Sequence, residues 1–118
     1  MGASASGGKL VIRFQDQEAE LCRDAEERIR IGSAPDNELS IDGEFVSRFH
    51  AEIRWGRTGF ELIDHSTNGA FVQLEDERVR YLHRSSFRLW GSGFVSLGEP
   101  PRAANALVFR NQQSSRQE

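Results

Sequence analysis

Three short segments of this 118-residue chain concentrate the hydroxyl, amide and guanidinium side chains that bind anions. One contains Ser33, the next contains Ser47 and Arg48, and the last contains Thr67 and Asn68. A hydroxyl donates a single hydrogen bond, whereas an arginine donates two and adds a permanent charge. The three segments therefore contain the donors that an anion site would need, provided that the fold brings them together.

The same part of the chain also contains the residue types of a hydrolase, because His65 lies between Asp64 and Ser66. Neighbouring residues at the end of one strand point in different directions, so these three do not predict a Ser/His/Asp triad. The three histidines and Cys22 show no short ligand spacing, so the sequence predicts no metal site. We expect a protein that is not an enzyme and uses no cofactor. A small hydrolase that uses His50 or His65 is an alternative, and it requires a histidine within hydrogen-bond reach of a hydroxyl.

The composition argues against several other classes of protein. The chain is 37% hydrophobic and 28% charged with a net charge of −3, and this acidity argues against a general nucleic-acid binder. No apolar run approaches the roughly 20 residues of a membrane span. Residues 1–8 contain neither a basic nor an apolar region, so they do not predict a secretory signal. With its single cysteine, the chain is expected to be cytoplasmic and to bind neither nucleic acid nor membrane.

The charged residues are unevenly distributed along the chain. The first 47 residues carry ten acidic and five basic side chains, whereas residues 48–118 carry eight acidic and ten basic ones. Every basic residue except Lys9 is an arginine. Because arginine presents a rigid, permanently charged fork, we expect any anion site in this protein to use it.

Between two polar ends, the chain alternates apolar and polar residues in short pieces that are bounded by turn residues. The predicted strands are residues 10–15, 18–22, 28–32, 38–41, 49–55, 60–64, 71–74, 78–82, 87–90, 94–97 and 107–110. Short strands at this spacing indicate an all-β, antiparallel β-sandwich of about ten to eleven strands. We expect a flexible leader at residues 1–8, a sandwich domain at residues 9–110 and a polar tail at residues 111–118.

The three polar segments resemble the signature of the forkhead-associated (FHA) domain. The family pattern has a Gly-Arg pair, then a Ser-x-x-His motif, then an aspartate followed closely by Ser-x-Asn-Gly and a strand. The matching positions here are residues 32–33, 47–50 and 64–69, in the same order and at similar spacing. The resemblance implies an eleven-stranded sandwich of the FHA/SMAD type. Residues 89–98 are also similar to the FHA modules of bacterial class III nucleotide cyclases, where a Gly-Ser-Gly run occupies this place.

The resemblance implies binding of phosphothreonine-containing peptides and a role for each residue of the three segments. The implied peptide-binding residues are Ser33, Ser47, Arg48, Thr67 and Asn68, with the asparagine on the peptide backbone. The residues implied to brace the loops from behind are Gly32, His50, Asp64, Ser66 and Gly69. An asparagine that pairs with a peptide N–H and C=O adds affinity without a preference for particular side chains.

Ser33 is the main departure from the family pattern, because the family has at this position an arginine that clamps the phosphate. Losing one charge-assisted hydrogen bond costs about 1.5–3 kcal/mol, which is roughly 10- to 150-fold in affinity. Ser33 retains a neutral donor, Arg48 retains a charge, and strand alternation places Arg30 on the same face as Gly32. The sequence therefore leaves open a degenerate FHA domain that acts as a phosphate-independent docking or oligomerisation module.

These observations together predict a non-enzymatic signalling module that recognises a protein or peptide phosphorylated on threonine. We expect it to be monomeric as an isolated domain and to be part of a larger bacterial signalling protein such as a nucleotide cyclase. Phe45, Phe49 and Trp55 are expected in the core rather than on a ligand-stacking surface. Cys22 is expected as a small buried residue in a strand.

Overall fold

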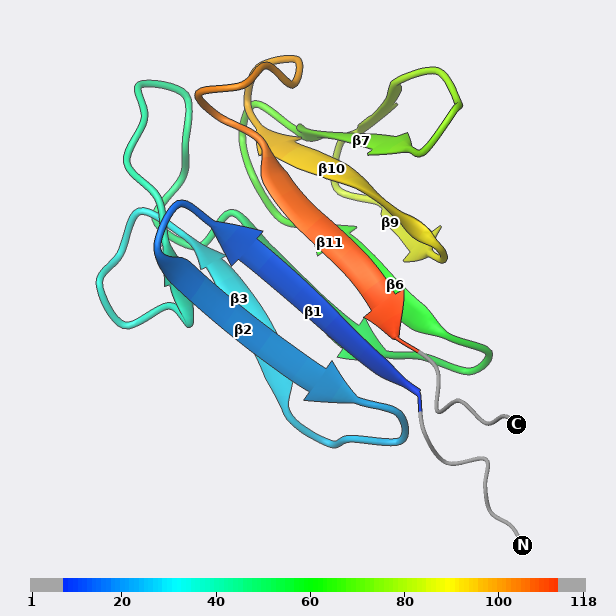
Figure 1. Ribbon diagram of the computed structural model, residues 1–118. Coiled ribbons are helices and arrows are strands. Elements are labelled where there is room, and N and C mark those ends of the chain that lie inside the picture. The colour runs from blue at the N-terminus through cyan, green and yellow to red at the C-terminus, as the bar shows by residue number, and fades with distance from the viewer. Residues whose placement is uncertain (1–7, 113–118) are drawn as a thin grey trace, which may run out of the picture.

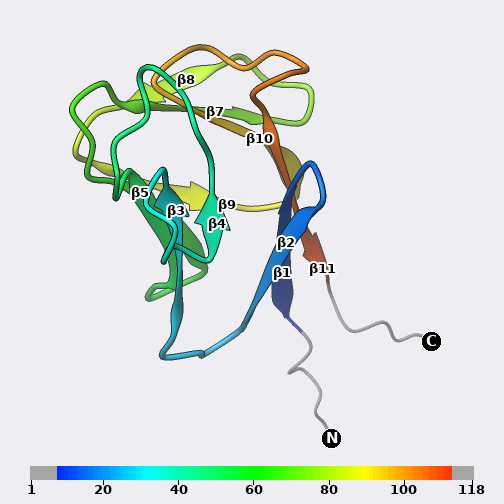
Figure 2. The same cartoon turned by 90° about the vertical axis from the view of Figure 1, so that its left-hand side faces the viewer.

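The computed structural model, which describes residues 8–112, is a sandwich of two β-sheets (Figures 1 and 2). Sheet A has six strands in the order β2-β1-β11-β10-β7-β8, and sheet B has five in the order β4-β3-β5-β6-β9. The strands are β1 (Lys9–Phe14), β2 (Gln17–Cys22), β3 (Arg28–Gly32), β4 (Leu39–Ser40), β5 (Ala51–Trp55), β6 (Phe60–Asp64), β7 (Ala70–Leu74), β8 (Arg80–Leu82), β9 (Ser86–Leu89), β10 (Ser92–Leu97) and β11 (Leu107–Gln112). Within this part of the chain, all pairings are antiparallel except β3–β4. The prediction of an all-β sandwich is confirmed.

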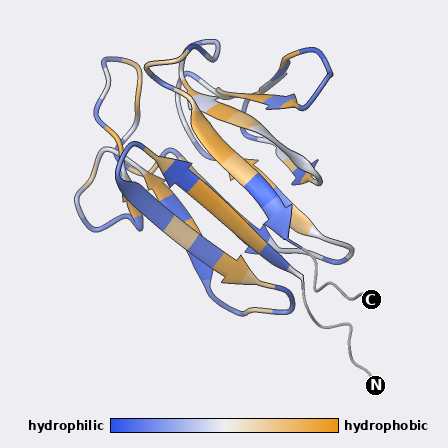
Figure 3. Ribbon diagram, in the orientation of Figure 1, coloured by the Kyte–Doolittle hydropathy of each residue, from blue (hydrophilic) through white to orange (hydrophobic). Residues whose placement is uncertain are grey.

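The core lies between the sheets because apolar side chains alternate inward along the strands. Ile29 and Ile31 on β3 are almost fully buried, while Arg30 between them is exposed. Leu10 and Ile12 on β1 are buried in the same way. Figure 3 shows this alternation as orange and blue bands along β1 and β2. Burying each of these aliphatic side chains stabilises the fold by about 1.5–3 kcal/mol.

The register of sheet B brings three connections to one end of the sandwich. Ala51, at the start of β5, pairs with Asp64 at the end of β6 and with Ile31 near the end of β3. The connections that follow β3 and β6 and the connection that precedes β5 therefore extend beyond the same end of the sheet. In Figure 1, the two connections on either side of β4 project from this end, and Figure 2 shows it facing the viewer. We call it the loop end.

Strand boundaries differ from the sequence predictions at a few places. β5 begins two residues later than expected, because residues 48–49 form a turn before it. β11 runs to Gln112, which pairs with Lys9 on β1, so residues 111–112 are strand rather than tail. The rest of the expected leader and tail, residues 1–7 and 113–118, lies outside the described residues. In residues 8–112, no helix has the length and apolarity needed to cross a membrane.

Three residues expected in the core lie at the surface instead. Cys22 is exposed because strand alternation directs Leu21 inward and the cysteine outward at the end of β2. Phe45 and Phe49 are 40% and 52% exposed, because they lie in the turns before β5 rather than in a strand. Trp55, by contrast, is partly buried and packs against the core, as the sequence predicted. The sequence prediction for these aromatic residues was therefore wrong at the two phenylalanines.

Candidate functional site

We call residues 32–37, 45–50 and 64–69 the first, second and third loops. The first and second loops are joined by backbone hydrogen bonds. The N–H of Ser33 donates to the Ser47 carbonyl, and the N–H of Ala34 donates to the Arg48 carbonyl, both over 3.1 Å. The side-chain amide of Asn37 donates a further bond to the Arg48 carbonyl over 2.8 Å. These bonds hold the two loops side by side.

Gly32 is required by this close approach. A Cβ atom at position 32 would lie 2.2 Å from the carbonyl oxygen of Arg48, which is much closer than two such atoms can come. Gly69 in the third loop has a different constraint, because its φ of +85° lies in the left-handed region that favours glycine. A Cβ atom there would also lie 2.5 Å from the Tyr81 side chain. Both glycines therefore permit a backbone path that another residue would obstruct.

The third loop docks on the second through several hydrogen bonds, one of which joins the N–H of His65 to the His50 carbonyl over 2.9 Å. The N–H of Thr67 donates to Ser47 Oγ over 3.4 Å, and the side-chain amide of Asn68 donates to the Phe45 carbonyl over 3.2 Å. The Tyr81 hydroxyl, from β8, donates to the Asn68 carbonyl over 3.1 Å. The structure thus brings together the five residues for which the sequence predicted ligand contact. The two serines among them are half-buried, and the arginine, threonine and asparagine are exposed.

His50 connects the second loop to the third from below. Its side chain is fully buried, and its Nδ1 accepts the N–H of Ser47 over 3.0 Å. The proton therefore lies on Nε2, which donates to the Gly69 carbonyl over 2.7 Å. Burial lowers the pKa of His50 below its ordinary value, although the Gly69 carbonyl and the charge of Asp64 oppose this effect. The neutral imidazole thus spans the two loops that carry Ser47 and Asn68.

Asp64 is the buried acceptor that shapes the third loop. Its carboxylate accepts the Ser66 hydroxyl over 2.7 Å and the N–H of Arg84 over 2.8 Å. It also accepts the N–H of Ser66 over 3.2 Å. The Ser66 oxygen in turn accepts the N–H of Gly69 over 2.7 Å. Three donors share this carboxylate, so removing it would leave buried polar groups without an acceptor.

These bonds leave no pairing of nucleophile and base for the hydrolase alternative. The Ser66 hydroxyl donates its proton to Asp64, and both ring nitrogens of His50 are already hydrogen-bonded. The exposed ring of His65 lies elsewhere, with Nε2 3.5 Å from the Glu52 carboxylate. Within residues 8–112, no group of three or more His, Cys, Asp or Glu side chains could hold a metal ion.

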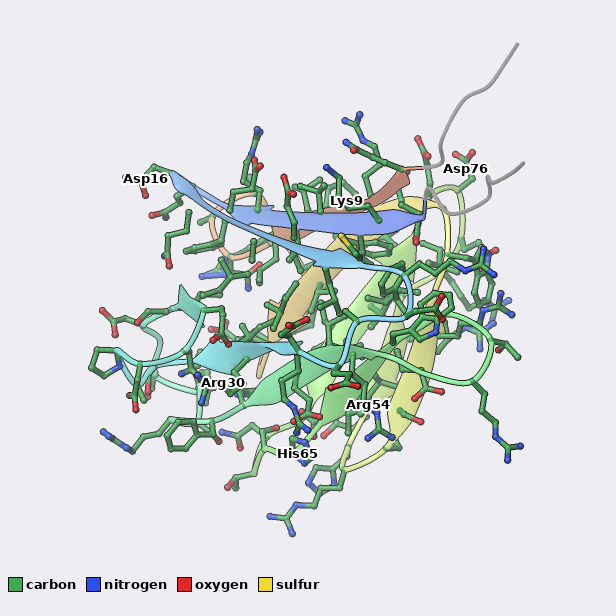
Figure 4. All side chains as sticks on the ribbon, turned by 90° about the horizontal axis from the view of Figure 1, so that it is seen from below. Lys9, Asp16, Arg30, Arg54, His65 and Asp76 are labelled. Carbon is green, nitrogen blue, oxygen red and sulfur yellow. The ribbon has the colours of Figure 1, made fainter. Side chains whose placement is uncertain are left out.

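Arg48 is the exposed cation that the loops present. Its guanidinium makes neither an ion pair nor a side-chain hydrogen bond with the part of the chain that the structure describes. Arg30, by contrast, binds Glu38, with Nη2 3.0 Å from Oε2 and Nε 3.1 Å from Oε1. This pairing raises the pKa of Arg30 and lowers the pKa of Glu38. In Figure 4, Arg30 lies with Arg54 and His65 on the side of sheet B, across the sandwich from β1. The Arg30 guanidinium is therefore bound to Glu38 and to the Asp36 carbonyl, whereas Arg48 belongs to the loop rim, which we define as the surface formed by Ser33, Ser47, Arg48, Thr67 and Asn68.

Three residues that support the site were not predicted from the sequence. Asn37, Tyr81 and Arg84 each donate a hydrogen bond to the backbone of a loop residue. Asn37 could have been noticed, because it belongs to the Pro-Asp-Asn turn of the first loop. Tyr81 and Arg84 could not, since they lie 13 and 18 residues from their partners and reach them only through the β7–β8 pairing.

A comparison with protein-family models matches residues 29–89 to the FHA domain. This region contains all three loops and runs from β3 through β9. A search of curated proteins finds no match.

Several solved structures share the fold of this chain. FHA-1 of Rv1747 from Mycobacterium tuberculosis superposes with a TM-score of 0.72 at 19% identity, covering 92% of this chain and 100% of that one. A domain from a structural and functional analysis of phosphothreonine-dependent FHA domain interactions has a TM-score of 0.59 at 23% identity, covering 89% and 96%. EmbR from Mycobacterium tuberculosis, in complex with a low-affinity phosphopeptide, has a TM-score of 0.57 at 26% identity. The match covers 96% of this chain but 26% of EmbR, so this chain corresponds to one part of that protein.

Proposed function

Because the chain belongs to the FHA domain family, we propose that it binds peptides phosphorylated on threonine through the three loops. The observation that carries this proposal is the convergence of the five polar residues on one rim. Ser47, next to Ser33, accepts the backbone N–H of Thr67, and Asn68 lies one residue farther along. This proximity of the three loops supports the binding of a single anion by all of them.

The chemistry of the rim suits a phosphate monoester. Ser33, Ser47 and Thr67 supply neutral hydroxyl donors, and Arg48 supplies two parallel donors together with a charge. A dianionic phosphate needs several donors and at least one cation to offset the loss of its hydration. We assign these four residues to the phosphate and Asn68 to the backbone of the peptide.

Preorganisation supports the same assignment. The backbone and buried side-chain bonds described above hold the loops in one arrangement before any ligand arrives. Binding then avoids much of the conformational entropy that ordering three free loops would cost, about 1–2 kcal/mol for each residue backbone. We assign Gly32, His50, Asp64, Ser66 and Gly69 to this bracing function.

Ser33 favours a second candidate function, a docking module that binds its partner without phosphate. Arg48 is the one arginine within the three loops, and nearby Arg30 is bound to Glu38. Phe45 and Phe49 are exposed beside Arg48 in the second loop, where they could bind an unmodified apolar segment. The two functions differ in one measurable property, the dependence of affinity on phosphate.

An NMR titration with a matched pair of peptides tests the choice. We expect the phosphothreonine peptide to shift the amide signals of Ser47, Thr67 and Asn68 and to bind at least tenfold more tightly than its threonine counterpart. Equal affinity for both peptides would contradict phosphate recognition and favour the docking module. The Arg54→Ala variant, which removes an exposed arginine of β5, should bind like the wild type.

The remaining expectations concern the cellular setting and stay predictions from the sequence. We propose a non-catalytic module that is monomeric in isolation and acts in the cytoplasm as part of a bacterial signalling protein. The resemblance of residues 89–98 to the modules of nucleotide cyclases has no support among the similarities described above.

A further inference from the structure

The side of the sandwich formed by β8 and β9 carries a cluster of arginines on aromatic rings. We define the β8–β9 edge by five residues, which are Arg80, Arg84, Phe87, Arg88 and Trp90. β8 is the last strand of sheet A and β9 is the last strand of sheet B, so both have an unpaired side. The acidic residues among the first 47 residues lie in and around β2, β3 and β4. β2 and β4 are the edge strands at the opposite side of the sandwich from β8 and β9.

The rings at this edge form a continuous stack with two arginines. Phe87 and Trp90 are stacked with centroids 5.9 Å apart. The guanidinium of Arg80 lies 5.9 Å from the Phe87 centroid, and that of Arg88 lies 6.0 Å from the Trp90 centroid. A guanidinium over a ring can still donate hydrogen bonds in its own plane, so stacking orients both cations while leaving their donors available. Trp90 is 48% exposed, which is unusual for so large an apolar side chain.

Each arginine of the edge lacks a carboxylate partner in residues 8–112. The carboxylate nearest in register to Arg88 is that of Glu61, which lies 3.8 Å from Arg54 instead. The Nε of Arg84 donates to the Ser66 carbonyl over 3.1 Å and leaves its other nitrogens available. The edge therefore presents three exposed arginines that form no ion pair within residues 8–112, and the carboxylates nearest to it along the chain, Glu75, Asp76 and Glu77, lie in the turn before β8.

This edge is continuous with the loop rim. Arg84 bonds the residue that precedes Thr67, and Tyr81 of β8 bonds the carbonyl of Asn68. β9 starts beside Ile63, close to the third loop, and runs away from it to Leu89 beside Phe60. At about 3.3 Å per residue, the ring stack lies about 7–13 Å from the loop end, a distance that two to four extended residues span.

We propose that the β8–β9 edge binds acidic residues that flank the phosphothreonine of the peptide ligand. The proposal rests on the function proposed above and names a property of its ligand. Arg84 would contact the acidic residue nearest the phosphate, and Arg80 and Arg88 would contact acidic residues two to four positions farther along. An acidic peptide complements the charge of the edge, and its extended backbone can lie beside an unpaired strand. The partner is therefore a protein with a threonine phosphorylated inside an acidic segment.

Fluorescence anisotropy with four peptides on the whole chain tests this proposal. Two phosphothreonine peptides carry three glutamates on either the N-terminal or the C-terminal side, a third carries neutral residues, and the fourth is an unphosphorylated acidic peptide. We expect one of the two acidic phosphopeptides to bind about fivefold to tenfold more tightly than the neutral one at about 50 mM salt. The gain should shrink at higher salt, because exposed charges are screened.

The double variant R80Q/R88Q should lose this gain and still bind the neutral phosphopeptide like the wild type. The control is R13Q/R110Q, which removes the same charge from exposed positions on the outer side of β1 and β11 and should retain the gain. Equal affinity for the acidic and neutral phosphopeptides would overturn the proposal and leave phosphothreonine binding intact. If R80Q/R88Q and R13Q/R110Q reduced the gain equally, the proposal would also be overturned. The attraction would then depend on the total charge of the protein and not on the β8–β9 edge.

Two other outcomes separate this proposal from its premise. If none of the phosphopeptides binds more tightly than the unphosphorylated peptide, the proposed function itself fails, and the acidic flank fails with it. Analytical sedimentation of the chain without peptide tests whether a second copy of the chain binds at the β8–β9 edge. Self-association that R80Q/R88Q abolishes would overturn the peptide proposal and assign the edge to a second copy.

Discussion

The loop rim and the β8–β9 edge both present arginine to solvent, but different interactions hold the two regions in place. Behind the rim lie a fully buried histidine, a buried carboxylate and a set of backbone hydrogen bonds. The edge is held by ring stacking at the surface, where Trp90 and the three arginines are exposed. Changes behind the rim should therefore alter folding and binding together. Changes at the edge should alter binding alone, by small amounts that depend on salt.

Removing the carboxylate behind the rim should have the largest effect. Asp64→Ala leaves the Ser66 hydroxyl and the N–H of Arg84 without an acceptor. We expect the free energy of unfolding to fall by about 3 kcal/mol, measured by urea denaturation. Asp64→Asn is the control, since it keeps one acceptor oxygen and should lose less. A loss below about 1 kcal/mol in the alanine variant would show that the buried network does not hold the third loop.

Removing the cation on the rim should affect binding and leave folding unchanged. Arg48→Ala deletes the exposed guanidinium, and we expect the affinity for a phosphothreonine peptide to fall at least tenfold. Isothermal titration calorimetry measures the affinity, and urea denaturation should show a free energy of unfolding within about 0.5 kcal/mol of the wild type. Unchanged affinity would mean that the phosphate is bound elsewhere or is not recognised.

The buried histidine should make stability depend on pH. Since burial lowers the pKa of His50 in the folded protein, the unfolded chain binds the extra proton more readily. The free energy of unfolding is therefore highest above the ordinary histidine pKa of about 6.5. It decreases as the pH falls from there through the lower pKa that His50 has in the folded protein. One proton limits the slope to about 1.4 kcal/mol per pH unit. Urea denaturation between pH 7.5 and 5 measures it, and His50→Gln should flatten the profile. An identical slope in that variant would assign the effect to other groups.

Adding a cation to the first loop should have the smallest of these effects. Ser33→Arg restores the charged residue of the family pattern beside Ser47, and we expect phosphopeptide affinity to rise about fivefold. Ser33→Gln is the matched control for side-chain size without charge. No change in either variant, together with a peptide that binds equally without phosphate, would favour the docking module. A gain in both variants would show that added contact area rather than charge is responsible.

The sequence predicted the fold well, because the fold depends on local patterns, whereas the ligand contacts of the five loop residues stay predictions. Period-two alternation between turn residues is a direct consequence of strand geometry, so it located strands such as Arg28–Gly32 to within a residue or two. The same reasoning failed for Phe45 and Phe49, since apolar character alone does not reveal that these residues lie in turns outside a strand. It also failed for Cys22, which lies one position out of phase with the buried Leu21.

The supporting residues could not be predicted in the same way. Arg30 was placed on the expected face, but its binding to Glu38 depends on the parallel pairing of β3 with β4. Tyr81 and Arg84 reach the third loop because β8 pairs with β7 and the chain then turns back toward β6. These contacts join residues far apart in the chain, so no spacing in the sequence signals them.

The amino-acid sequence by itself determined the strand pattern, the polar character of three loops and the serine at position 33. These are properties of single residues and of their neighbours along the chain. Only the tertiary structure decided that the Arg48 guanidinium is available at the loop rim and that His50 and Asp64 brace the loops. It also decided that arginines and aromatic rings gather at the β8–β9 edge. Those outcomes depend on strand order and register, because hydrogen bonds and stacking operate over a few ångströms in space whatever the separation along the chain.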